Sequence, residues 1–100
     1  MPPDFAKATT GGQPLPEKPI RLTRHAMGYL DRRGFSVAEV ETAIRTAPWG
    51  PAELGRQHCF KDFPFNAVWN GRRYATKQVR PVFIEEPVVI IVITVYTYYF

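Results

Sequence analysis

The last thirteen residues of the chain, 88–100, contain no glycine, proline or charged residue. Each of them is β-branched or aromatic, which is the composition that most favours a β-strand. Over the first half of this run both alternating faces are apolar, which is typical of a strand with neighbours on both edges and cover on both sides. The run is too short and too rich in hydroxyl groups for a membrane helix, which needs about 20 apolar residues. We therefore predict that it forms the central strand of a small sheet.

The length of 100 residues predicts a single domain, and a hydrophobic content of 45% suffices for one modest core. The formal net charge of +4 favours an acidic partner, either RNA or an acidic protein. The only cysteine, Cys59, excludes an internal disulfide and is typical of a reducing compartment. No charged segment followed by an apolar stretch opens the chain. We therefore expect a cytoplasmic protein with no membrane anchor.

The start of the chain differs from the rest in composition. Seven of the first 19 residues are proline or glycine, and few are large and apolar. This composition predicts a mobile leader over 1–19 and a single domain over 20–100. The domain begins with a candidate edge strand, Ile20-Arg21-Leu22.

Two helices are predicted in the first half of the domain. The first covers 24–33, with Thr23 as its N-cap and Gly34 as a left-handed C-cap. The second covers 37–47 and begins with the capping box Ser36-Val37-Ala38-Glu39. Joined tightly, these helices would form a hairpin that covers one face of the sheet.

The second half of the domain has the pattern of strands and turns. Three further strands are predicted, over 57–61, 66–69 and 72–84. Turns are expected at 62–64, at Asn70-Gly71 and at 85–87. Pro81 inside the long strand implies a bulge or an unpaired edge position. The expected fold is α+β, an N-terminal helical hairpin packed on a twisted antiparallel sheet of three or four strands.

A polar set of side chains is predicted on one face of the last two strands. A three-residue turn at 85–87 would pair Arg80 with Val92 and Gln78 with Thr94. The shared face would then carry four polar residues, Gln78, Arg80, Thr94 and Tyr96, with Lys77 and Arg73 on the opposite face. Next to a helix that bears His25, such a face could bind and cleave a phosphodiester. The alternative is a solvated sheet face without catalytic function.

Other site chemistries find little support in the sequence. The two histidines, His25 and His58, are far apart, and no HExxH, CxxC or glycine-rich phosphate loop occurs. We therefore expect no metal and no cofactor. Cys59 follows His58, but adjacent strand residues point to opposite faces, which favours a packed cysteine over a nucleophile. Five aromatic residues are interpreted as core and loop anchors and not as base-stacking platforms: Trp49, Phe60, Phe63, Phe65 and Trp69.

Several segments together resemble one protein family. They are Thr23-Arg24-His25-Ala26, Arg33-Gly34-Phe35-Ser36, Glu39-Val40, Ala43-Ile44 and Ile93-Thr94-Val95-Tyr96. Through them, residues 20–100 resemble the DUF4258 family of small prokaryotic proteins. The segment Lys77-Gln78-Val79-Arg80-Pro81, with Glu85-Glu86, is similar to a signature of a subgroup within that family.

The resemblance implies a RelE- or barnase-like fold and a toxin-like, metal-independent endoribonuclease that cleaves RNA through attack of its 2′-hydroxyl. On this hypothesis His25 is the general base or acid. Arg80 and Lys77 are alternative phosphate stabilisers, and Thr94 and Tyr96 orient the phosphate or donate a proton.

Further RNA contacts are expected from Lys77, Arg24 and Arg73. The chain departs from the family at Tyr29, where the family tends to carry an arginine. A phosphate-binding role of that arginine would be missing here, or taken over by Arg24, Arg32 or Arg80.

Two alternatives stay open. The protein could be a non-catalytic basic module that binds RNA or protein, or an inactive toxin relative, and Tyr29 favours this reading. It could also be the effector piece of a larger secreted toxin, with 1–19 as a linker remnant. Expected partners are RNA and a small antitoxin protein, and the sequence is compatible with a monomer or a homo-oligomer.

Overall fold

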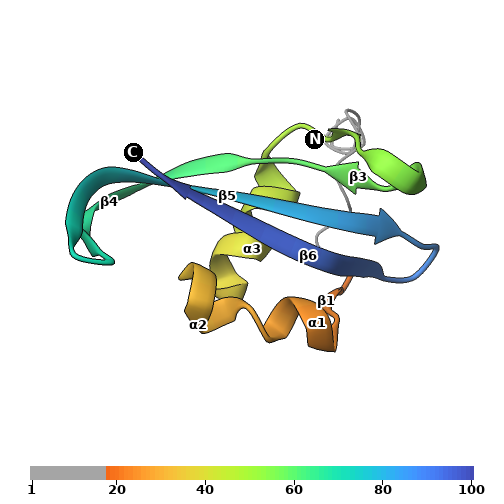
Figure 1. The fold of residues 1–100 in the computed structure, drawn as a ribbon. Coiled ribbons are helices and arrows are strands. Elements are labelled where there is room, and N and C mark those ends of the chain that lie inside the picture. Colours follow the sequence, from red (N-terminus) through yellow and green to blue (C-terminus); the bar gives the residue numbers. More distant parts are fainter. Residues whose placement is uncertain (1–17) are drawn as a thin grey trace.

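The computed structural model describes residues 18–100. They form an α+β fold in which three helices accompany a six-stranded mixed sheet (Figure 1). All but two residues of the predicted leader, 1–19, lie outside the described part of the chain.

The sheet has the order β1-β6-β5-β3-β2, and β4 also pairs with β5. The strands are β1 (Ile20–Leu22), β2 (Gly50–Pro51), β3 (Gln57–His58), β4 (Lys61–Trp69), β5 (Arg72–Glu85) and β6 (Ile90–Tyr99). The predicted edge strand is confirmed as β1, and β6 is the predicted central strand, between β1 and β5. The expectation of an antiparallel sheet of three or four strands is wrong, because β1 pairs with β6 in parallel.

Strands β3 and β4 lie end to end along the same edge of β5, since both pair with β5 in the same register. The residues between them, Cys59 and Phe60, leave the ladder beside Pro81. Proline has no N–H to donate, although its carbonyl still accepts a hydrogen bond from the Cys59 N–H at 3.3 Å. The irregularity expected at Pro81 is thus a break in the neighbouring strand. The turn predicted at 62–64 is wrong, because those residues lie inside β4.

The register between β5 and β6 also differs from the prediction. Arg80 pairs with Tyr96 and not with Val92. One cause is the connecting loop, which covers 86–89 and is longer than the predicted turn. The other is a bulge, because β6 has the extra residue Ile93 where the pairing shifts between Val82 and Phe83. The displacement spans an even number of residues, so the predicted polar set still shares one face: Gln78, Arg80, Thr94 and Tyr96.

The helix predicted over 24–33 is two separate turns, α1 (Arg24–Met27) and α2 (Leu30–Arg33). Glycine costs about 1 kcal/mol relative to alanine inside a helix, and the interruption falls at Gly28. The predicted caps are confirmed: the Thr23 side chain accepts from the N–H of Ala26, and Gly34 has a φ of 78°. A hairpin of two regular helices is therefore not formed.

The helix α3 (Val37–Thr46) begins with the predicted capping box, in which Ser36 and Glu39 each accept the other's N–H. Its buried face packs on β5, and the core includes Phe35, Val40, Ile44, Val79, Phe83, Ile90, Val92 and Val95. Trp49 anchors the chain after the helix, because its indole N–H donates to the carbonyl of Ile44 at 2.9 Å. Among residues 18–100, no helix has the length and apolar character needed to cross a membrane.

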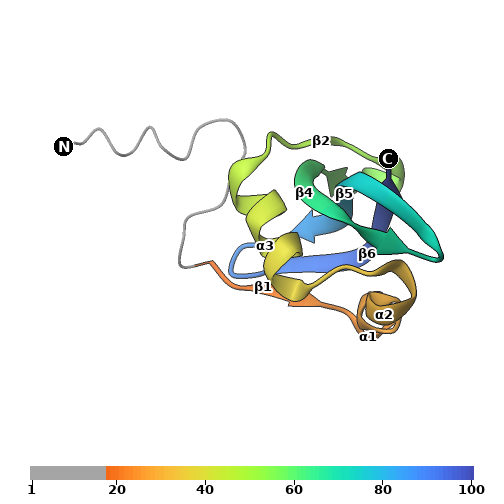
Figure 2. The same cartoon turned by 90° about the vertical axis from the view of Figure 1, so that its left-hand side faces the viewer.

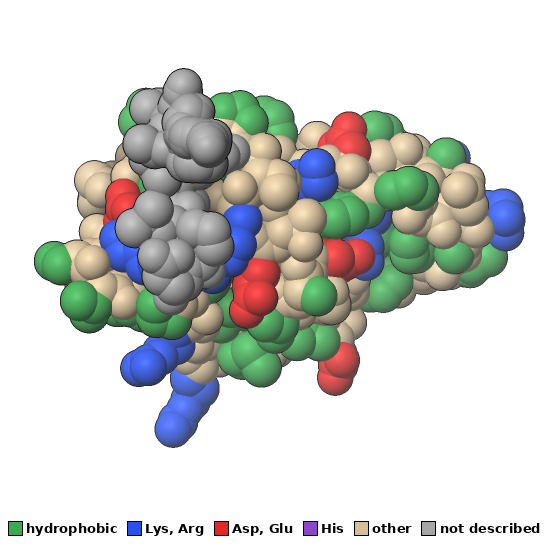
Figure 3. Space-filling view, turned by 180° about the vertical axis from the view of Figure 1, so that it is seen from behind, with side chains coloured by type: hydrophobic (Ala, Val, Ile, Leu, Met, Phe, Trp, Pro, Cys, Tyr) green, Lys and Arg blue, Asp and Glu red, His purple; other side chains and the backbone are tan. Residues whose placement is uncertain are grey.

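The two faces of the sheet differ, because a helix covers only one of them. In Figure 1, α3 lies behind the sheet, while α1 and α2 run along the edge near β6 and β1; Figure 2 shows the same arrangement from the side. Seen from behind, acidic and basic side chains are interspersed on the helical side (Figure 3). We call the opposite side, which carries Gln78, Arg80, Thr94, Tyr96 and Tyr98, the open face.

Candidate active site

A cleft of about 580 Å³ lies on the open face, at the end of the sheet that carries β3. The 3-10 turn Glu53–Gly55 forms one rim, where Leu54 is exposed and has a positive φ of 61°. Strands β3, β5 and β6 form the floor. The polar side chains that line the cleft are Glu53, Arg56, His58, Arg80, Thr94 and Tyr96.

The closest polar contact in the cleft joins His58 and Arg80. The Nε of Arg80 donates a hydrogen bond to Nδ1 of His58 at 2.9 Å. Burial, and secondly the positive charge of Arg80, lower the pKa of His58 below its ordinary value of 6.5. Because Nδ1 accepts a hydrogen bond, the neutral ring carries its proton on Nε2. The cleft thus holds a neutral imidazole beside a guanidinium.

Arginine and tyrosine side chains alternate in a row that begins at Arg80 in the cleft and ends at Arg32 on α2. The guanidinium of Arg80 lies 5.5 Å from the ring centre of Tyr96, and that of Arg33 lies 5.1 Å from the same ring. Arg33 also lies 3.9 Å from the ring centre of Tyr29, and Arg32 lies 4.9 Å from it. Each distance falls within the range of an attractive cation–π contact.

Hydrogen bonds fix Arg33 in this position. Its guanidinium donates to the carbonyl of Val95 at 2.8 Å and to the hydroxyl of Thr94 at 3.4 Å. The carbonyl of Arg33, at the end of α2, accepts from the hydroxyls of Thr97 at 2.6 Å and Tyr99 at 2.9 Å. The short helix α2 is therefore docked on β6, and its last residue borders the site.

Three of the four predicted catalytic residues, Arg80, Thr94 and Tyr96, line the cleft. The fourth, His25, does not. It is exposed on α1, and its ring meets that of Tyr29 edge-on at 5.0 Å. The histidine of the cleft is His58 instead.

Sequence reasoning missed His58, Arg33 and two further residues of the cleft, Glu53 and Arg56, as site residues. His58 pairs with Val82, two positions from Arg80, so both side chains face the cleft. That relation depends on the register across the break at Pro81, which the sequence does not show. For Arg33 a local signal exists, because Tyr29 lies four residues earlier and such residues are neighbours on a helix surface.

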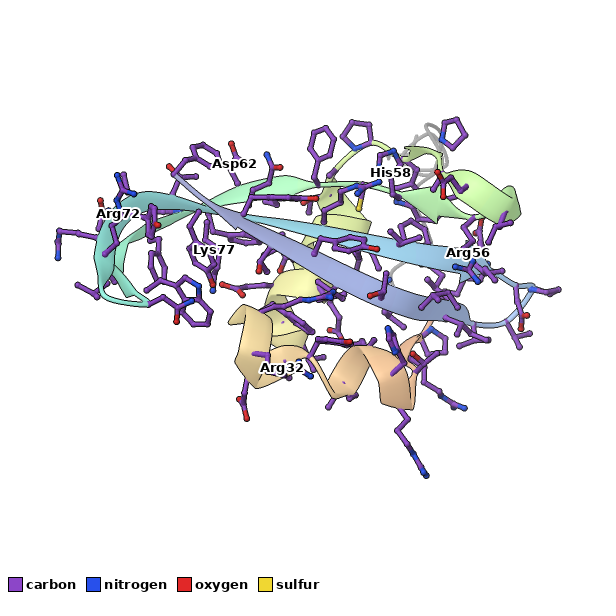
Figure 4. The ribbon with its side chains drawn as sticks, viewed as in Figure 1. Arg32, Arg56, His58, Asp62, Arg72 and Lys77 are labelled. Atoms are coloured by element: carbon purple, nitrogen blue, oxygen red, sulfur yellow. The ribbon has the colours of Figure 1, made fainter. Side chains whose placement is uncertain are left out.

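The predicted RNA-binding residues lie outside the cleft. Lys77 is buried on the helical side, 2.9 Å from the carboxylate of Glu39, and it donates to the carbonyl of Gly34 at 2.8 Å. Arg73 is exposed in the β4–β5 hairpin and donates to the carbonyl of Asn66 at 3.0 Å. Arg24 is exposed on α1. Figure 4 shows Lys77 near α2, far along the sheet from Arg56.

Cys59 is packed in the core, as predicted, and only 2% of its surface is exposed. Burial raises the pKa of its thiol to about 12, so the reactive thiolate is scarce at neutral pH. Cys59 is not among the residues that line the cleft.

Within residues 18–100, no three His, Cys, Asp or Glu side chains gather closely enough to hold a metal ion. Comparisons with protein-family models, curated proteins and solved structures found no match to this chain. The site is therefore interpreted from its own geometry.

Proposed function

We propose that the protein is a metal-independent endoribonuclease whose reaction takes place in the cleft. The observation that carries the proposal is the contact between His58 and Arg80, 2.9 Å apart in a cleft that also contains a carboxylate and two hydroxyls. Cleavage of RNA by its own 2′-hydroxyl needs a base, an acid and cations that stabilise the charge on phosphorus. The cleft holds a carboxylate suited to act as base, a histidine suited to act as acid, and two arginines as cations.

In the proposed reaction, the 2′-oxygen bonds to phosphorus and the bond from phosphorus to the 5′-oxygen breaks. Glu53 accepts the proton of the 2′-hydroxyl, and protonated His58 gives a proton to the leaving 5′-oxygen. Arg80 and Arg56 stabilise the negative charge on the phosphorane. The products are a 2′,3′-cyclic phosphate and a free 5′-hydroxyl.

Substrate itself prepares His58 for this role. A phosphodiester in the cleft places a negative charge near the imidazole, which favours the protonated ring. Protonation at Nδ1 removes the acceptor used by Arg80, so the Nε–H of Arg80 becomes free to bind the phosphate. The hydroxyls of Thr94 and Tyr96, in the same cleft, orient the phosphate oxygens.

The test is cleavage of a short unstructured RNA in EDTA. Glutamine at position 58 can still accept a hydrogen bond from Arg80 but cannot transfer a proton, so His58→Gln should lower the rate by about 100-fold or more. The matched control is His25→Gln, which should leave the rate unchanged. Intact RNA with the wild type, or equal rates with His58→Gln, would overturn the proposal.

A second candidate is a module that binds RNA without cleaving it. It is favoured by Tyr96, whose ring is contacted by the guanidinium groups of both Arg80 and Arg33. Such an array suits binding of phosphates and bases and needs no proton transfer. RNA binding by the wild type without any cleavage would select this candidate.

The resemblance to the DUF4258 family and a RelE- or barnase-like arrangement belong to the same proposal. On this view the protein is a cytoplasmic toxin held inactive by a small acidic antitoxin. Arrest of growth when the wild-type protein is induced, and normal growth with His58→Gln, would support this role.

A further inference from the structure

We infer that the open face beside the cleft binds the bases of single-stranded RNA on a strip of three aromatic side chains, Phe60, Tyr98 and Phe100. This inference rests on the proposed function, since it extends the RNA site beyond the cleft. The proposed cleavage in the cleft does not require these three residues.

The strip follows from the register of the sheet. Tyr96 pairs with Arg80, and Tyr98 pairs with Gln78. Phe100 continues the series, because its backbone exchanges hydrogen bonds of 2.7 and 3.1 Å with Thr76. Alternate residues of a strand share a face and lie about 7 Å apart. Tyr98 and Phe100 therefore extend the open face away from the cleft in equal steps.

Phe60 joins the strip to the cleft. It lies in the break between β3 and β4, and its ring meets that of His58 edge-on at 6.1 Å. Beyond it, a shallow groove of about 380 Å³ is bounded by Phe60, Lys61, Asp62 and Gln78 on the sheet and by Thr46, Ala47 and Pro48 at the end of α3. Phe60 thus lies between His58 of the cleft and this groove.

The three rings are available to a ligand. The exposed fractions of Phe60, Tyr98 and Phe100 are 53%, 44% and 57%. Within residues 18–100, the side chain of Tyr98 makes no hydrogen bond, ion pair or ring contact. Large aromatic groups exposed together on one face mark an interaction surface.

The positive charge that borders the open face favours RNA as its ligand. The guanidinium groups of Arg33, Arg56 and Arg80 border the same face, and the chain has a net charge of +4. Asp62, which lies next to Phe60 and bounds the groove, already accepts a hydrogen bond from Gln78 at 2.8 Å. Arginines that hold the backbone, next to rings that stack on unpaired bases, are the pattern of single-strand binding. A duplex does not fit, because its bases are stacked on one another.

The probe that separates the strip from the chemistry is a fluorescent RNA octamer with 2′-O-methyl groups. Without a free 2′-hydroxyl it binds but cannot be cleaved. Replacing a ring by alanine removes the stacking of one base from the binding free energy. Tyr98→Ala and Phe100→Ala should therefore each raise the Kd about 5- to 100-fold. Tyr98→Phe keeps the ring and should bind like the wild type.

The matched control is Met27→Ala, which removes a side chain that is 46% exposed on α1, away from the strip. It should leave the Kd unchanged, and thermal melting should show all variants folded. If Tyr98→Ala and Phe100→Ala bind as tightly as the wild type, the strip is refuted, whether or not unmodified RNA is cleaved. If the wild type does not bind the octamer, the strip is also refuted and an acidic protein becomes the candidate occupant. If binding depends on the rings but unmodified RNA stays intact, the strip stands and the nuclease proposal fails.

Discussion

Arg80 on β5 donates a hydrogen bond from its Nε to Nδ1 of His58 on β3, at 2.9 Å. The two residues are 22 positions apart in the sequence, and they meet because β3 pairs with β5 immediately next to the break at Pro81. A guanidinium that donates to an imidazole stabilises the neutral ring and opposes its protonation. This contact sets the charge state of the cleft.

Replacing Arg80 should therefore raise the pKa of His58. Burial is the larger cause of the lowered pKa and Arg80 the smaller, so Arg80→Gln should move it only part of the way back to 6.5. NMR titration of the imidazole resonances measures it. The chain has only two histidines, so His25→Gln identifies the His58 signal. An unchanged pKa in Arg80→Gln would contradict the geometry of this contact.

The lowered pKa of His58 also predicts a dependence of stability on pH. The folded state binds a proton at His58 less readily than the unfolded state, whose pKa is 6.5. The contribution of neutral His58 is therefore complete above pH 6.5 and is lost as the pH falls through the folded-state pKa. Relative to His58→Gln, the wild type should lose free energy of unfolding as the pH falls from about 7.5 to about 5. Urea titrations of both proteins at these pH values measure the difference, and a constant difference would refute the prediction.

A side chain at Gly34 should destabilise the protein more than one at Gly71. Its φ is 78°, and a Cβ there would lie 2.7 Å from the ring of Trp69 and in conflict with the Tyr99 hydroxyl. Gly71 is a matched control, since it has a φ of 81° but nothing within 4 Å of the same position. Gly71→Ala should cost about 1 kcal/mol of unfolding free energy from the backbone alone. Gly34→Ala should cost about 2 kcal/mol more, because packed aromatic rings must move. Equal losses in chemical denaturation would show that the rings yield freely.

Replacing Lys77 should lower the stability of the fold and leave the affinity for RNA unchanged. Lys77→Met removes the ion pair with Glu39 and leaves the carbonyl of Gly34 without its lysine donor, which should cost about 1–3 kcal/mol. The affinity for the 2′-O-methyl octamer should not change. Arg72→Met, at the exposed tip of the β4–β5 hairpin (Figure 4), should cost less than about 0.5 kcal/mol. A loss of RNA affinity with unchanged stability would return Lys77 to the RNA site.

Features of the fold that depend on local sequence could be predicted well: one strand, the start of one helix and one turn. β-branched and aromatic residues specify β6, a reciprocal cap specifies the start of α3, and Asn70 and Gly71, both with positive φ, form the predicted hairpin turn. These features depend on residues that are close in the sequence. The interruption of the first helix at Gly28 shows the limit, because a cost of about 1 kcal/mol does not decide by itself whether a helix continues.

The pairing of the strands could be predicted only in part. The shared face of Arg80, Thr94 and Tyr96 follows from the alternation of side chains, and it is preserved because the register moved by an even number of residues. Placing His58 in the cleft required the continuity of β3 and β4 across Pro81, which is a long-range property. The exposure of Phe60 has the same origin, since it lies in that break and does not serve as the expected core or loop anchor.

The bulge at Ile93 decides which residues of β6 face the core. On one side of the bulge, Ile90 and Val92 face the core; on the other side, Val95 does. If Ile93 were kept but the strand were regular, alternation from Val92 would turn Thr94 inward and Val95 outward. The cleft would then lose the Thr94 and Tyr96 side chains, and α2 would lose the hydroxyls that hold its last carbonyl. Deleting Ile93 would instead remove the extra residue and leave every later side chain on its present face. Substitutions in β6 can therefore affect the fold or the site separately, whereas loss of the bulge with Ile93 retained affects both at once.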